Sequence, residues 1–201
     1  TAGIIAASGN NSIGICGVAF GAKILLLKCG DNSGNDVAFG YEGIIMAADM
    51  GAKVVNNSWG GSNRSPVGQD IVDYATAKNC VVVAASGNSS SFDNLYPASY
   101  NHVLSVGAVA ESGHFTNFSN YNAHVDVSAP GNNVLSTIPN AAYMTMTGTS
   151  MASPNADGAI DLIRQNFTDL TPAQTVERLR ATSDQLNVDL VIHPGTTEQM
   201  A

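Results

Sequence analysis

Short apolar runs alternate with segments of helical periodicity along the first half of the chain. Ala22–Lys28 (AKILLLK), Val81–Ala85 and His102–Val109 are apolar almost throughout, as expected of strands buried on both faces. Between them, 37–50 and 67–79 carry apolar residues at helical spacing. This order predicts an α/β fold with three layers, in which helices cover both faces of a mostly parallel sheet.

Lys53–Asn57, between the two helical segments, is a further short strand candidate. The second half of the chain is less regular: Val125–Ser128 and Val134–Thr137 are short β-like pieces separated by turns. Two helices are expected at the end, over 150–165 and over 172–182, where Pro172 suits a first helical turn.

Composition excludes several classes of protein. With 201 residues, 44% hydrophobic and 12% charged, the chain can bury the core of one domain and is not disordered. A net charge of −8 repels phosphate backbones, so a nucleic acid is not an expected partner. No apolar run is long enough to span a membrane. The residues from Val188 to Ala201 are expected to form a peripheral tail.

The cysteine pattern does not predict a metal site. Cys16, Cys29 and Cys80 form no C-x-x-C pair, so zinc is not expected. Three thiols allow at most one internal disulfide, and whether one forms is open. The simplest interpretation is that they are small buried hydrophobic residues.

Three loops that follow expected strands or precede a helix are rich in Gly, Ser and Asn: 57–61, 85–88 and 147–154. Ser150 follows a glycine loop and opens a helix, where the helix dipole stabilises an alkoxide. Asn88 ends a strand, where its amide could donate to negative charge on a substrate oxygen. Taken alone, a hydroxyl in 149–153 could equally be an N-cap, and Asn88 a turn residue.

The three loops together resemble the subtilases, the subtilisin-like serine peptidases. Gly148–Pro154 (GTSMASP) resembles their nucleophile motif, Val54–Gly61 (VVNNSWGG) their substrate-binding strand, and Ala84–Asn88 (AASGN) their oxyanion segment. Companion stretches occur in the expected order at 1–3 with 10–14, 96–98, 106–109 and 128–131. The resemblance covers essentially the whole chain and implies one peptidase domain over residues 1–201.

The resemblance implies a role for each matching residue. Ser150 would be the nucleophile of a serine endopeptidase, and Asn88 with the backbone N–H of Ser150 would form the oxyanion hole. An extended polypeptide substrate would pair with Ser58, Trp59 and Gly60. Ala85, Ser86 and Gly87 would line a roomy pocket opposite, which Trp59 could narrow. The resemblance also implies a secreted or extracytoplasmic protein that is monomeric.

The chain departs from the family pattern at the catalytic base. The family's Asp and His match no residue here, and the His would stand just ahead of Thr1. The chain is therefore expected to be a fragment that lacks the N-terminal part and is inactive in isolation. The four histidines, at positions 102, 114, 124 and 193, lie in none of the matching places and are expected on the surface or in loops.

A second departure follows the nucleophile. The family commonly has Ser-Pro-His-Val-Ala-Gly, whereas this chain has Asn155, Ala156 and Asp157 after Pro154. A buried Asp157 would be costly without a partner. An inactive peptide-binding domain of the same fold is therefore the alternative to an endopeptidase.

No cofactor is required by the expected chemistry. Calcium, which this family often binds, is doubtful at the loop 10–14 and at the carbonyls of Ala98, Tyr100 and Val103, because a hard cation needs several oxygen ligands.

Overall fold

The central element of the molecule is a parallel four-stranded sheet. The computed structural model describes residues 1–31 and 36–186. The strand order is β1-β2-β3-β4, and every neighbouring pair is parallel. The strands of this sheet are β1 (Val54–Asn57), β2 (Val81–Ala85), β3 (Val103–Val109) and β4 (Val127–Pro130). Because the strands are parallel, their carboxyl ends lie at one edge, where ligands bind in open α/β sheets.

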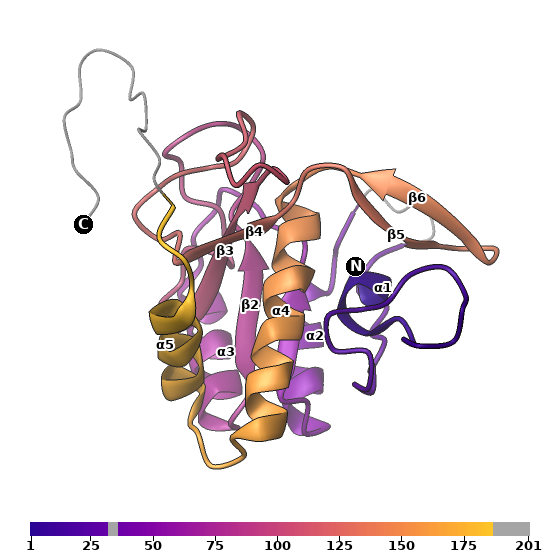
Figure 1. Ribbon diagram of the computed structural model, residues 1–201. Coiled ribbons are helices and arrows are strands. Elements are labelled where there is room, and N and C mark those ends of the chain that lie inside the picture. Colours follow the sequence, from indigo (N-terminus) through magenta and orange to yellow (C-terminus); the bar gives the residue numbers. More distant parts are fainter. Residues whose placement is uncertain (32–35, 187–201) are drawn as a thin grey trace.

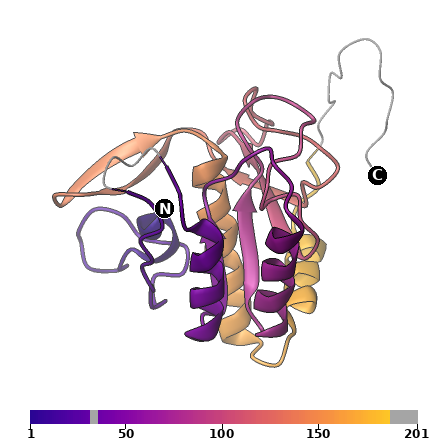
Figure 2. The ribbon, with the colours of Figure 1, turned by 180° about the vertical axis from the view of Figure 1, so that it is seen from behind.

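Helices cover both faces of this sheet (Figures 1 and 2). On one face, α2 (Gly40–Asp49) and α3 (Pro66–Ala77) pack over Val82 and Ala84. On the other face, α4 (Thr149–Asn166) and α5 (Pro172–Thr182) pack over Val81 and Val83. Alternate residues of β2 thus enter two separate cores, because successive side chains of a strand point to opposite faces. The expected three-layer α/β fold is confirmed.

The ends of the helices follow local signals in the sequence. Thr171 caps α5 with a capping box: its Oγ1 accepts from Gln174 N, and Gln174 Oε1 accepts from Thr171 N. Pro66 and Pro172 occupy first turns, where a missing N–H is tolerated. The expected helices at 37–50, 67–79, 150–165 and 172–182 are all present; the last has the expected ends, and the ends of the other three are shifted by one to three residues.

An antiparallel hairpin and a short helix lie beside the main sheet (Figure 1). The hairpin joins β5 (Val134–Ile138) to β6 (Ala142–Met146), and α1 (Ala2–Ala6) packs against α4 and β5. The sequence predicted only the first strand of the hairpin, and α1 was not expected.

The expected strand at Ala22–Lys28 is wrong. These residues form no strand, and the side chains of Ile24, Leu25 and Leu26 are 40%, 42% and 78% exposed. The apolar run has the composition of a buried strand, but a strand also requires a hydrogen-bonding neighbour. Within the described residues, β1 pairs only with β2.

The three cysteines differ in their surroundings. All are free, and only Cys80 is buried as expected, whereas Cys16 is exposed and Cys29 is intermediate. The expected peripheral tail from Val188 lies outside the described residues.

Candidate active site

Ser150 lies at the N-terminus of α4. Gly148 precedes the helix with φ of 153°, a conformation that favours glycine, and its N–H donates to the Gly131 carbonyl (2.8 Å). Ser150 is the second residue of the helix, so its own N–H belongs to the first turn and has no intrahelical acceptor. The helix dipole adds partial positive charge there, which favours an anionic oxygen.

Ser150 and Ser58 join this helix to the end of β1. The Oγ of Ser150 donates to the Ser58 carbonyl (3.3 Å), and the Oγ of Ser58 donates to the Ser150 carbonyl (2.9 Å). Asn56 extends the network, because it donates to Ser58 Oγ (3.0 Å) and accepts from Ser153 Oγ (2.7 Å). These bonds fix the segment after β1 against α4.

Asn88 is oriented by the same helix terminus. Its Oδ1 accepts from Thr149 N (2.8 Å) and from Thr149 Oγ1 (3.0 Å). A main-chain N–H can only donate, so the amide oxygen must face the helix. Asn88 is exposed, and its Nδ2 is left as a possible donor at the helix end that carries Ser150, whose N–H is a second donor. The structure brings these predicted residues to one helix end.

Thr149 links the loop at 85–88 to the start of α4. Its Oγ1 is fully buried, accepts from Gly87 N (3.2 Å) and donates to Asn88 Oδ1. We expect Thr149→Val to lower the free energy of unfolding by about 1–3 kcal/mol, because it leaves the Gly87 N–H buried without an acceptor. Urea unfolding measures this, and Thr145→Val, on an exposed position of β6, should change stability by less than about 0.5 kcal/mol. Equal effects of the two variants would contradict the coupling.

Gly131 supports the turn before α4. A Cβ built on this glycine would lie 2.6 Å from Ala108 Cβ and 2.9 Å from the Gly148 carbonyl oxygen. We therefore expect Gly131→Ala to destabilise the protein by about 1–3 kcal/mol, since β3 and the backbone at Gly148 must move apart. Thermal unfolding measures the loss. The matched variant is Gly61→Ala, whose Cβ would meet no atom within 4 Å; a destabilisation as large there would show that the contact at Gly131 is not its cause.

Two of the three loops lie at the carboxyl edge of the sheet. Ser58 and Gly60 follow β1, while Ala85, Ser86 and Gly87 end and follow β2. Leu95, which sequence reasoning missed, lies close to Gly60 and to Gly87. Its Cδ2 lies 2.6 Å from a Cβ built on Gly60 and 3.4 Å from one built on Gly87. Leu95 thus occupies part of the space that the small residues were expected to leave open.

Trp59 packs on the α2 side of the sheet. Its ring meets Tyr41 edge to face, with centroids 5.2 Å apart, and lies against Gly40, where a Cβ would be 2.5 Å from the ring. Gly40 begins α2, so a side chain at this position would displace the indole. These contacts of Trp59 are with α2, whereas Leu95 is the side chain found close to both Gly60 and Gly87.

The described histidines lie away from Ser150. His102, His114 and His124 are exposed, and His102 Nδ1 contacts Asp73 on α3 (3.0 Å). His193 lies outside the described residues. Within residues 1–31 and 36–186, the hydrogen-bond partner of Ser150 Oγ is the Ser58 carbonyl oxygen.

Two of the candidate calcium ligands accept hydrogen bonds from neighbouring main-chain N–H groups. The loop 10–14 contains no carboxylate, and Asn11 Oδ1 accepts from Ile13 N (3.0 Å). The Tyr100 carbonyl accepts from Val103 N (3.4 Å). The described residues hold no group of three or more His, Cys, Asp or Glu side chains placed to bind a metal.

Comparison with known proteins gives one consistent family. The family model described as "Subtilase family" matches residues 1–194. The chain is 41% identical over 191 residues to a thermophilic serine proteinase of Bacillus sp. (strain AK1), covering 92% of this chain and 46% of that protein. It is 42% identical over 163 residues to thermitase of Thermoactinomyces vulgaris, covering 81% and 58%. The chain thus spans about half the length of these relatives.

Solved structures agree with the sequence relatives. A protease of Pseudoalteromonas arctica matches with a TM-score of 0.81 and 33% identity over 92% of this chain and 63% of that one. Sphericase matches with a TM-score of 0.81 and 28% identity over 90% and 66%. The fold, the motifs around 58–60, 85–88 and 148–154, and these matches lead to one conclusion: the chain belongs to the subtilase family of subtilisin-like serine proteases.

Proposed function

We propose that the full-length protein containing this chain is a serine endopeptidase that cleaves peptide bonds through an acyl-enzyme on Ser150. One observation carries the proposal: the hydroxyl of Ser150 and the free amide donor of Asn88 share the N-terminus of α4. A nucleophile beside two N–H donors is the arrangement that acyl transfer requires. The names of the relatives, among them a serine proteinase, support the same reaction.

The proposed reaction uses groups of this chain together with groups from residues outside it. Ser150 Oγ attacks the substrate carbonyl carbon, and negative charge develops on the carbonyl oxygen, where Asn88 Nδ2 and Ser150 N donate. The Ser150 proton must pass to a base, and the Ser58 carbonyl that now accepts its hydrogen bond is not basic enough. We infer that a His and its orienting Asp are supplied from outside residues 1–201, as the family pattern implies.

The proposed substrate is a polypeptide in extended conformation. The main chain at Ser58 to Gly60 would pair with it, with the side chain before the cut pointing between this segment and Ala85 to Gly87. We further propose that the protein acts as a monomer outside the cytoplasm, which its net charge of −8 and few lysines support. Among the described residues, none of the helices is both long and apolar enough to cross a membrane.

We expect Leu95 to limit the size of the pocket for the substrate side chain before the cut. Replacing it with alanine removes three carbon atoms between Gly60 and Gly87. We expect Leu95→Ala to raise kcat/KM for a substrate with Phe before the cut relative to one with Ala by about 10-fold or more, since one methylene is worth about 1–3 kcal/mol. A matched pair of chromogenic peptides measures the ratio. An unchanged ratio would remove Leu95 from the pocket.

Active-site labelling tests the proposed function directly. The full-length protein is treated with a fluorophosphonate, and the modified peptide is identified by mass spectrometry. We expect modification of Ser150 in the folded protein and none after denaturation, because only an activated serine reacts. Absence of labelling, or labelling of another serine, overturns the proposal.

A non-catalytic peptide-binding domain is the second candidate. The observation that favours it is the hydrogen bond from Ser150 Oγ to the Ser58 carbonyl, which leaves the described chain with no base on the nucleophile. A full-length protein that resists labelling but binds an extended peptide at 58–60 would establish this alternative.

A further inference from the structure

Pro154 interrupts the main-chain hydrogen bonds of α4 beside the candidate nucleophile. It is buried and lies inside the helix, four residues after Ser150. In a regular α-helix, the carbonyl of Ser150 would accept from the N–H of residue 154. Proline has no N–H, and its ring crowds the carbonyl of the residue four positions earlier. The Ser150 carbonyl therefore lacks its ordinary helical donor.

The hydroxyl of Ser58 supplies a donor at this point. Its Oγ donates to the Ser150 carbonyl oxygen at 2.9 Å, although the two residues are 92 positions apart in the sequence. Because a carbonyl oxygen can only accept, the single proton of the Ser58 hydroxyl must point to it. The Ser58 hydroxyl thus makes the hydrogen bond that the N–H missing at Pro154 would otherwise make.

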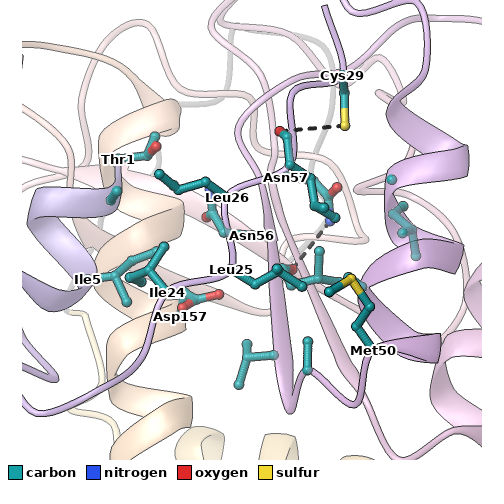
Figure 3. Close-up of a pocket in the computed structure, with 18 of the residues that line it drawn as sticks. Thr1, Ile5, Ile24, Leu25, Leu26, Cys29, Met50, Asn56, Asn57 and Asp157 are labelled. Carbon is teal, nitrogen blue, oxygen red and sulfur yellow. Dashed lines mark hydrogen bonds between the residues drawn. The ribbon is translucent and has the colours of Figure 1, made fainter. Parts of the chain in front are cut away.

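Two further side chains hold the Ser58 hydroxyl in this direction. Since its proton is used, Ser58 Oγ accepts from Asn56 Nδ2 (3.0 Å). The other end of the same amide, Asn56 Oδ1, accepts from the Oγ of Ser153 (2.7 Å), a fully buried residue of α4. Figure 3 shows Asn56 and its neighbour Asn57 on opposite sides of β1, as successive residues of a strand must be. The series of hydrogen bonds therefore begins on α4 at Ser153 and returns to α4 at Ser150.

This series acts on the reacting hydroxyl through the main chain of Ser150. Ser58 and Ser150 are joined at two points, because the Ser150 hydroxyl in turn donates to the Ser58 carbonyl (3.3 Å). One bond holds the helical turn that carries the nucleophile, and the other lies in the segment where the substrate is proposed to pair. A misplacement of about 1 Å in such a geometry can cost about 100-fold in rate. The Ser58 hydroxyl is thus placed to fix the distance between the nucleophile and the bound peptide.

We propose that the Ser58 hydroxyl positions the nucleophile by replacing the N–H that Pro154 lacks, and that Asn56 and Ser153 direct it. This role rests on the proposed peptidase reaction, because it acts through Ser150. It is distinct from the substrate pairing proposed for 58–60, which uses main-chain groups. Ser58, Asn56 and Ser153 are positioning residues in this scheme, since the reacting atoms belong to Ser150 and the substrate.

Loss of the Ser58 hydroxyl is the first test, made in the full-length protein. We expect Ser58→Ala to lower kcat for a chromogenic anilide peptide by about 10- to 100-fold and to change KM by less than about threefold, because the main chain at 58–60 is retained. The melting temperature is expected to fall by about 2 °C or more, since the Ser150 carbonyl loses its donor. The control Ser62→Ala, at an exposed position of the same loop, should leave kcat, KM and the melting temperature unchanged.

A second substitution returns the missing donor to the helix. In Pro154→Ala, residue 154 regains an N–H that can bond to the Ser150 carbonyl. In this background we expect Ser58→Ala to lower kcat by less than about threefold and the melting temperature by less than about 1 °C. Both proteins in this comparison carry Pro154→Ala, so the effect of that change by itself cancels.

Asn56→Asp gives an independent arm with almost no change of shape. A carboxylate cannot donate, so the Ser58 proton turns to it and leaves the Ser150 carbonyl. We expect kcat to fall by about 10-fold or more in Asn56→Asp, and adding Ser58→Ala to lower it by less than about threefold further. This arm decides where Pro154→Ala does not fold.

The contrary results separate this role from the proposed function. An active protein in which Ser58→Ala keeps wild-type kcat overturns the positioning role alone, as does a raised KM at unchanged kcat, which would place the hydroxyl on the substrate. Equal losses of kcat from Ser58→Ala with and without Pro154, or additive losses with Asn56→Asp, also overturn it. A full-length wild-type protein that is not labelled at Ser150 overturns the proposed function, and the positioning role with it.

Discussion

Replacing Ser150 by alanine in the full-length protein is expected to lower kcat for peptide hydrolysis by about 10⁶-fold, a magnitude established for loss of the nucleophile in a subtilisin. The variant removes the atom that would form the proposed acyl-enzyme but keeps the N–H of residue 150 and the amide of Asn88. KM should change little, because the proposed substrate contacts at 58–60 and 85–87 are retained. Residual turnover of about 10³–10⁴-fold over water is expected from the oxyanion hole and binding.

Chromogenic peptide hydrolysis measures this loss, with Ser89→Ala as the matched control. Ser89 is exposed one residue after Asn88, and its main-chain N–H bonds to Asn120 Oδ1 (2.9 Å) independently of its side chain. The control should retain wild-type kcat. If Ser150→Ala keeps activity within tenfold of wild type, Ser150 is not the nucleophile and the proposed function is wrong.

Asp157→Asn is expected to stabilise residues 1–201 increasingly as the pH rises from 4 to 8. Burial raises the pKa of the Asp157 carboxyl from 3.8 to about 7, and the charge of Asp161 adds to the rise. The folded chain therefore retains a proton that the unfolded chain releases. Below pH 4 both states are protonated and the carboxyl has no pH-dependent effect. Between pH 4 and 7 the Asp157 carboxyl lowers the free energy of unfolding progressively. Above pH 7 this lowering stays constant.

Complete ionisation of Asp157 is expected to lower the free energy of unfolding by about 4 kcal/mol. Because asparagine cannot ionise, the difference in unfolding free energy between variant and wild type should grow across this range by up to that amount. Urea unfolding at pH 4 and pH 8 measures it. Asp70→Asn, an exposed position on α3, supplies the control and should change the unfolding free energy by less than about 0.5 kcal/mol. A flat profile for Asp157→Asn would mean that the carboxyl is solvated.

Most of the main sheet and its helices could be predicted from local sequence. Val81–Ala85 matches β2 residue for residue, and the helix opened by Pro172 ends at Thr182 as expected. Both predictions depend on signals within a few residues, namely an apolar run of strand length and a proline that suits a first turn. The Gly148–Pro154 motif likewise placed Ser150 at a helix start because glycine and the following residues fix that turn locally.

The tertiary structure alone decided the features that depend on neighbours distant in sequence. Ala22–Lys28 has the sequence of a buried strand but lacks a pairing partner in the described residues, so it remains extended and exposed. The Asn88 amide faces outward because Thr149, 61 residues later, takes its oxygen. Leu95 and Trp59 are placed by contacts with Gly60, Gly87 and Gly40. The sequence by itself determined the family and most helices and strands of the main sheet, and it singled out Ser150 and Asn88, because these depend on local patterns. Only the fold decided pairing, pocket shape and the burial of Asp157, because each is a contact between distant segments.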